Sequence, residues 1–275
     1  SRMPRLAICP SGRRDGFGFS VAPHEVVKCG VWAKGRFRGE QMLYHSERIY
    51  GIDISKYQHV HKRRVYGIDW RNLRITRLGH TADRNALGAV DYPVSFVYIK
   101  STEGLTVFNP YYTQDVRAAR RYGFPVGAYH FFSTRPAMSQ ADYFLKKSRL
   151  RKGDLPPMLD VELSDRRIAA MGGRDVLFRE MLVWLKEVGR RSGTTPIIYV
   201  SQDFVNRYMP FAPEELKAYP VWVARYGEYT PYVHLLYWQL SPDGRVRGIQ
   251  GDVDIDVFNG SEEQFKRYLR AQTVK

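Results

Sequence analysis

Cysteine is scarce in this chain of 275 residues, which holds only Cys9 and Cys29. Because both precede residue 30, the rest of the chain has no disulfide framework and no thiolate metal site. The two thiols could pair or stay free, and the sequence favours neither. Long apolar runs are missing as well, since no segment approaches the ~18 apolar residues of a membrane-spanning helix. The first residues also lack the apolar core of a signal peptide, so we expect no membrane span and no export signal in this chain.

Acidic residues are few, with 28 Asp and Glu against 43 Lys and Arg, and the formal net charge is +15. A surplus of this size draws a protein toward polyanions such as nucleic acid, anionic membrane or acidic cell-wall polymer. Zinc-finger spacing and an aromatic RNA-recognition signature are both absent. We therefore expect no specific nucleic-acid partner, although charge alone does not choose among the polyanions.

Apolar residues are sufficient for a sizeable core, at 44% hydrophobic and 14% aromatic, which excludes a disordered or collagen-like chain. Residues 1–48 are rich in Gly and Arg and show no sustained periodicity, so we expect an irregular, partly disordered N-terminal extension. Residues 49–275 have a length usual for a single barrel domain.

Short apolar segments alternate with amphipathic ones along residues 49–275, which is typical of an α/β fold with a mostly parallel sheet. The pattern predicts eight strands and about five helices, and a closed barrel whose last third is mainly β. The strands are expected at 50–54, 94–101, 125–132, 157–163, 195–201, 220–225, 235–240 and 252–257, and helices near 70–78, 110–122, 136–150 and 175–191.

Polar residues at strand ends are the candidate site, because barrel enzymes gather their active sites at the carboxyl ends of the strands. Asp160 and Glu162 in MLDVEL are alternate residues of one strand, so both carboxylates enter one space about 6.6 Å apart at Cα. Crowding separates their pKa values and leaves one acid protonated and the other ionised, which is what glycoside hydrolysis requires. Further strand-end candidates are Asp53 in GIDIS, Asp254 in DVDIDVF, Glu103 and His130.

Each of these residues also has a plainer interpretation, since a single strand-end carboxylate is usually a cap or a surface ion pair. Aromatic faces suit sugar rings, but at least half of the strand aromatics are expected to be barrel core. The candidate substrate-binding residues are Tyr98, Tyr129, Phe131, Tyr199, Trp222, Tyr226, Trp238 and Gln239, with Tyr237 also near a strand end.

A series of motifs between about residues 49 and 260 resembles the lysozymes of glycoside hydrolase family 25. The motifs are YGIDISKYQ with IDW, FVYIKSTEG with NPYY, VGAYHFF, LPPMLDVE, PIIYVS, VWVARYG, YWQLS and VRGIQGDVDIDVFNG. The resemblance implies a flattened, TIM-like (β/α)5(β)3 barrel. It further implies cleavage of the β-1,4 bond between N-acetylmuramic acid and N-acetylglucosamine in peptidoglycan, with no metal or cofactor.

The resemblance also implies roles for the acids. Glu162 would be the general acid and then the base, Asp160 its partner, and Asp53 and Asp254 the acids of the first and last strand motifs. The substrate's 2-acetamido oxygen would assist the reaction, while a direct nucleophile and inversion by water remain open. The protein would act as a monomer on peptidoglycan glycan strands in an extracellular, periplasmic or envelope location.

Two departures from the family pattern stand out. The stretch HVHKRRVYG, residues 59–67, lengthens the usually short step after the first strand motif and is expected to be a solvated loop or a contact to the glycan. Asp256 replaces an Asn that is common in the family, adding an acid near Asp254. The rival functions are a chitin-type glycosidase, a catalytically inactive wall-binding module and a charge-driven nucleic-acid binder; the DxxDxDxE pattern of chitinases is absent.

Overall fold

The computed structural model describes residues 7–8, 14–20, 28–34, 36–40, 49–80, 85–224 and 234–275. Before residue 49 it contains four antiparallel strands in the order β1-β2-β3-β4, where the sequence pattern predicted none. Cys9 lies outside the described ranges. The strands are β1 (Ala7–Ile8), β2 (Arg14–Ser20), β3 (Lys28–Ala33) and β4 (Arg36–Glu40).

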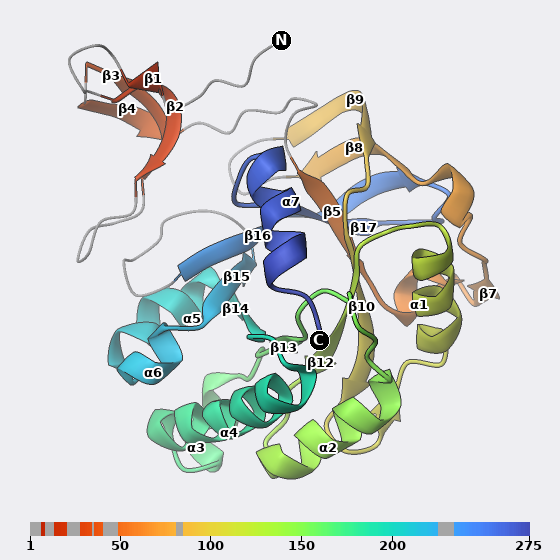
Figure 1. Ribbon diagram of the computed structural model, residues 1–275, viewed down its shortest axis with the longest axis vertical. Coiled ribbons are helices and arrows are strands. Elements are labelled where there is room, and N and C mark those ends of the chain that lie inside the picture. Colours follow the sequence, from red (N-terminus) through yellow and green to blue (C-terminus); the bar gives the residue numbers. More distant parts are fainter. Residues whose placement is uncertain are drawn as a thin grey trace.

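Eight strands close into a barrel (Figure 1). Neighbours follow the order β15-β14-β13-β12-β10-β5-β17-β16, and the pairing of β15 with β16 closes the ring. All neighbouring pairs are parallel except β16–β17 and β17–β5. The predicted mixed α/β barrel is confirmed. Its strands are β5 (Tyr50–Ile54), β10 (Val97–Glu103), β12 (Val126–Phe131), β13 (Met158–Asp160), β14 (Ile197–Ser201), β15 (Pro220–Ala224), β16 (His234–Arg247) and β17 (Val253–Phe258).

Helices follow four of the parallel strands and lie around the outside of the barrel (Figure 1). In α4, the buried residues Leu177, Met181, Leu185 and Val188 recur at three- to four-residue spacing and form the apolar face that packs inward. Gly193 ends this helix in a left-handed conformation, with φ of 69°. The helices are α1 (Tyr112–Arg121), α2 (Ala137–Ser148), α3 (Asp165–Ala170), α4 (Arg174–Ser192), α5 (Gln202–Arg207), α6 (Glu214–Lys217) and α7 (Glu262–Ala271).

The helix predicted near residues 70–78 is wrong. A single 3-10 turn, Trp70–Asn72, leads into β8 (Arg74–His80), which pairs with β9 (Asn85–Pro93) and with the far end of β16. Register irregularities in the β8–β9 ladder break the strict alternation of a strand. As a result, the buried Ile75 and Leu78 are three residues apart and imitate one face of a helix.

The stretch 59–67, which lengthens the family pattern, is partly buried and is held to the rest of the fold through His59. His59 is 1% exposed, its Nε2 lies 2.6 Å from Asp115 Oδ2, and its ring stacks on Tyr111 at 4.1 Å between centroids. The expectation of a solvated loop is therefore wrong for His59. It holds for Lys62 and Arg63, the exposed turn between β6 (Val60–His61) and β7 (Arg64–Val65).

An aromatic cluster fills the barrel interior, as side chains do in barrels of this kind. Gly51 and Gly127 make room for it, because a Cβ would lie 2.3 Å from the Phe96 ring at Gly51 and 2.4 Å from the Tyr98 ring at Gly127. Helix α7 supplies Phe265 to this cluster and so covers the end where the parallel strands begin (Figure 1). The opposite end, where the parallel strands finish, is left for the candidate site.

Candidate active site

The four predicted acids come together at the carboxyl ends of the parallel strands. Asp53 is the fourth residue of β5 and is paired in register with Asp254 on the adjacent antiparallel strand β17. Asp160 ends β13, and Glu162 follows two residues later. The charge of Asp160 acts on Asp53, and the charges of Glu162 and Asp254 act on Asp160. Sequence positions far apart therefore form one acidic cluster.

Asp160 and Glu162 enter the same space because the chain stays extended between them. Val161 is 1% exposed and packs in the core, and its backbone N–H donates a 2.9 Å hydrogen bond to the carbonyl of Tyr199 on β14. Asp160 is 7% exposed, whereas Glu162 is open to solvent. The pair thus combines one sheltered acid with one that an incoming molecule can reach.

Burial raises the pKa of Asp160 well above its usual value, and the charge of Glu162 raises it further. Burial also raises the pKa of Glu162, against the opposing effects of Lys100 and of a hydrogen bond with Asp160. Both carboxyl groups therefore retain a proton at a higher pH than an isolated side chain would. A carboxyl group whose pKa is raised in this way is better suited to act as a proton donor than an ordinary one.

Asp256 adds a further acid beside Asp53. It is fully buried on β17, and burial followed by the charge of Asp254 raises its pKa well above the usual range. The pKa of Asp53 is raised well above its usual value by burial first and then by the charge of Asp256. Two carboxyl groups this close inside a protein do not ionise together easily, so the pair favours holding a proton.

Lys100 on β10 is the cation of this region that the sequence analysis did not single out. Its Nζ lies 2.7 Å from Glu103 Oε2 and 4.6 Å from the centre of the Phe131 ring. It lowers the pKa of both Asp160 and Glu162. The sequence feature that could have identified Lys100 is its position as the one charged residue in the otherwise apolar segment FVYIK. Glu103 is therefore the ion-pair partner of a site residue.

Three of the candidate substrate-binding side chains border the acids. Tyr129 and Tyr199 are 7% and 8% exposed, and burial followed by the nearby carboxylates raises the pKa of each well above the usual value. The Tyr199 hydroxyl donates a 3.4 Å hydrogen bond to Gln239 Oε1. Phe131, at the end of β12, is half-buried beneath Lys100.

The predictions for three other aromatic residues need correction. Tyr98 and Trp222 are 0% exposed inside the barrel, where the Tyr98 hydroxyl donates to the carbonyl of Pro156 at 2.9 Å, so neither offers a face to a sugar. Trp238 is 2% exposed and belongs to the outer core, on the opposite face of β16 from Gln239. Tyr237 is likewise interior core, and Tyr226 lies outside the described residues.

His130 is not part of the site. It is fully buried behind β12, where its ring is hydrogen-bonded to Thr102 and Gln140 and stacks on Trp184. Burial lowers its pKa to about 4. The alternation of the strand explains the misplacement, since Tyr129 and Phe131 point to the other face.

A cavity of about 500 Å³ extends from Glu162 along the neighbouring strand ends. Tyr199 and Gln239 line it on the barrel side, while Asp165, Asp203 and Tyr208 line it farther out. The cavity therefore joins the exposed acid to aromatic and amide groups that suit a carbohydrate. Across the described ranges, no group of three or more His, Cys, Asp or Glu side chains could hold a metal ion. No helix in those ranges is long and apolar enough to cross a membrane.

Comparison with known proteins bears on what this site does. Residues 52–249 match the model of the family described as glycosyl hydrolases family 25. The chain is 33% identical to the uncharacterised protein YegX of Escherichia coli, over 82% of this chain and 74% of that one. It is 29% identical to lysozyme M1 of Streptomyces globisporus, over 78% and 68% of the two chains. The solved bacterial lysozyme of Streptomyces coelicolor superposes with a TM-score of 0.64 at 26% identity, over 80% of this chain and 96% of that one.

Proposed function

The chain belongs to glycosyl hydrolase family 25 and is a glycoside hydrolase of the lysozyme type, and we propose that its substrate is peptidoglycan. The bond cleaved is the β-1,4 link between N-acetylmuramic acid and N-acetylglucosamine. Support comes from relatives named as lysozymes and from a basic surface suited to an acidic polymer. The place of action is extracellular, periplasmic or at the cell envelope, where that polymer is found.

The observation that carries this proposal is the pairing of a sheltered Asp160 with an exposed Glu162 on one extended segment. Glycoside hydrolysis needs a proton for the leaving oxygen and a counter-charge for the oxocarbenium-like centre. Glu162 has the accessibility and the raised pKa of a general acid. Asp160 lies on the same face of the strand, beside the point where positive charge develops.

In the first step, the neutral Glu162 carboxyl gives its proton to the glycosidic oxygen as the bond from that oxygen to the anomeric carbon breaks. The carbonyl oxygen of the 2-acetamido group forms a bond to the same carbon, which gives a cyclic oxazolinium ion. Asp160 accepts a hydrogen bond from the acetamido N–H and stabilises its positive charge. Burial raises the pKa of Asp160, and the positive charge of the ring opposes this effect by favouring the carboxylate form in which Asp160 acts.

In the second step, Glu162 is a carboxylate and takes a proton from water. The water oxygen forms a bond to the anomeric carbon, the bond to the acetamido oxygen breaks, and the configuration is retained. Asp53 and Asp254, facing each other across β5 and β17, set the negative potential of the site and accept hydrogen bonds from sugar hydroxyls. Tyr129, Phe131, Tyr199 and Gln239 line the path of the glycan, and Tyr226 is assigned by its motif alone.

Turnover of purified peptidoglycan by Glu162→Gln tests this assignment, since the change removes the transferable proton and little volume. Rates should fall by about 10²–10⁴-fold, the usual contribution of general acid–base catalysis, with the fold retained. Glu263→Gln on α7 is the matched control, because that exposed carboxylate lies on the helix that covers the opposite end of the barrel. Wild-type rates from Glu162→Gln would refute the assignment.

A further inference from the structure

Four arginines on β8 and β16 form two directly opposed pairs, which we call the arginine face. Arg77 pairs in register with Arg245, and Arg74 with Arg247. Arg77, Arg245 and Arg247 are exposed, and Arg74 is partly so. Like charges placed directly opposite each other destabilise a sheet, so strand pairing alone gives no reason for this arrangement. An anion lying across the face would remove the repulsion.

The arginine face is the continuation of the sheet surface that carries the acids. On β16, Val246 packs into the core, so Arg245 and Arg247 lie on the opposite face. On the neighbouring β17, Val253 and Ile255 pack into the same core, and Asp254 lies on the opposite face. The arginine face therefore adjoins the side of the sheet that holds Asp254.

Contacts at the junction place the two regions close together. Gly244 pairs in register with Val253, one residue from Arg245 on one strand and from Asp254 on the other. Arg245 Nη2 lies 3.0 Å from Oδ1 of Asp252, two residues before Asp254. A glycan strand that extends from the acids past Asp254 toward β8 would pass beside the arginine face.

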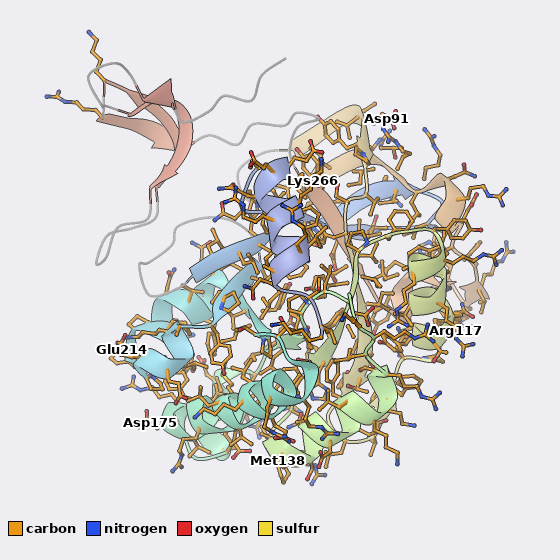
Figure 2. All side chains as sticks on the ribbon, viewed as in Figure 1. Asp91, Arg117, Met138, Asp175, Glu214 and Lys266 are labelled. Carbon is orange, nitrogen blue, oxygen red and sulfur yellow. The ribbon has the colours of Figure 1, made fainter. Side chains whose placement is uncertain are left out.

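The ion pairs on the arginine face neutralise only part of its positive charge. Arg74 Nε lies 2.8 Å from Oδ1 of Asp91, which Figure 2 shows on β9 at the margin of the molecule, and Arg245 pairs with Asp252. No ion pair within the described ranges involves Arg77 or Arg247. The charge of Arg247 also acts on Asp91, but without a close ion pair. The guanidinium groups of Arg77 and Arg247 thus remain on the face, and guanidinium binds carboxylate through paired hydrogen bonds.

We propose that the arginine face binds the carboxylates of the stem peptides that branch from muramic acid, on the strand whose glycan occupies the acidic site. This inference rests on the proposed function and adds a second recognition element to it. The acidic cluster binds the sugar, and Arg77 and Arg247 bind the carboxylates of the peptide. Since the arginines stand beside the reacting bond rather than at it, they act on substrate affinity and leave the chemical step alone.

The test uses soluble, uncrosslinked glycan strands, either bearing stem peptides or freed of them by an amidase. Titration calorimetry gives the Kd of the full chain in a Glu162→Gln background, which prevents turnover. Adding Arg77→Gln with Arg247→Gln should weaken binding to peptide-bearing strands by about tenfold and leave binding to stripped strands within twofold. The matched control is Arg117→Gln with Arg179→Gln, an equal loss of charge on α1 and α4; Figure 2 labels Arg117.

Equal Kd values for the double variant and the control on peptide-bearing strands would overturn the inference. So would an equal loss on both kinds of strand, which would indicate general attraction of the glycan. A loss seen only with strands that carry a phosphodiester polymer would assign the face to phosphate instead and also overturn it. The proposed function is judged separately, by whether wild-type protein cleaves the stripped strands; calorimetry tests the arginine face in either case.

Discussion

Asp53 on β5 stands directly opposite Asp254 on β17, in register across an antiparallel pair of strands. This pair belongs to the antiparallel part of the barrel, where β17 is inserted between the first parallel strand, β5, and the last, β16. Residues two hundred positions apart thereby supply neighbouring carboxyl groups, and Asp256 joins them from the same face of β17. The pKa of Asp53 therefore depends on the charge of its neighbour Asp256.

Replacing Asp256 by Asn should lower the pKa of Asp53. The negative charge of Asp256 disfavours ionisation of Asp53, so its removal favours the Asp53 carboxylate. Carbon-13 NMR titration of the side-chain carboxyl carbons follows this group directly. An unchanged or higher pKa for Asp53 would contradict the coupling, provided that the melting temperature shows an intact fold.

Lys100→Met should move the alkaline limb of the kcat/KM profile to higher pH. Lys100 lowers the pKa of Glu162, so without it the acid keeps its proton to a higher pH, and activity that needs the protonated form persists further. The exposed Lys146→Met on α2 is the control for loss of one positive charge. A shift to lower pH, or the same shift in both variants, would count against the proposed role of Glu162.

The pair His59–Asp115 should make folding stability depend on pH. Burial lowers the pKa of His59, but the hydrogen bond and charge of Asp115 outweigh it, and the net pKa is raised. When the pKa of a histidine is higher in the folded than in the unfolded protein, the histidine adds to the free energy of unfolding. This contribution is fully present below the pKa of the unfolded state, about 6.5, and is lost as the pH rises through the pKa of the folded state. Urea unfolding of wild type should therefore show this loss above about pH 6.5, and His59→Gln should flatten it. A wild-type slope that the variant keeps would disprove the linkage.

Asp115→Ala should lower the free energy of unfolding by about 3–5 kcal/mol, because it leaves a buried histidine without its partner. Asp142→Ala, which removes an exposed acid paired with Arg191, should lower the free energy of unfolding by ~1 kcal/mol or less. Urea denaturation compares the two. Equal, small losses would mean that the loop after β5 is not anchored through this pair.

Removal of residues 1–48 should leave the melting temperature of the barrel within about 2 °C of that of the full chain. For a domain of this size, a change of ~1 kcal/mol in the free energy of unfolding shifts the melting temperature by about 2–4 °C. The division at residue 48 is our proposal, supported by strands β1–β4 that pair with one another and with no described barrel strand. Calorimetry of residues 49–275 against the full chain is the measurement. A markedly lower melting temperature would place the extension in the same cooperative unit.

Much of the barrel was predictable from sequence because its strands are short, β-branched and bounded by clear turns. Residues Tyr50–Ile54 coincide with the predicted strand, and α4 was evident from its apolar spacing. The β8–β9 hairpin was not predictable, because register irregularities hide its alternation. The cross-strand arginine pairs depend on that hairpin, so only the structure could reveal the arginine face.

The acids were identifiable from their position at strand ends, whereas the aromatic residues were not. Alternation says that neighbours point to opposite faces, but not which face is the interior or how deep a side chain lies. Tyr98 and Tyr199 are both interior-facing tyrosines, yet Tyr98 is sealed in the core and Tyr199 borders the cavity beside Glu162. The two tyrosines differ in how far they lie from the open end of the barrel, and that distance is determined by tertiary packing.

The most direct test of the account identifies the new reducing ends released from purified peptidoglycan, after borohydride reduction and mass spectrometry, for wild type and Glu162→Gln side by side. Wild type should release fragments with reduced muramic acid ends, and the variant should release almost none. Reduced glucosamine ends from wild type would contradict the assigned bond. Equal yields of muramic acid ends from both proteins would contradict the role of Glu162, and no fragments from wild type would contradict peptidoglycan as the substrate.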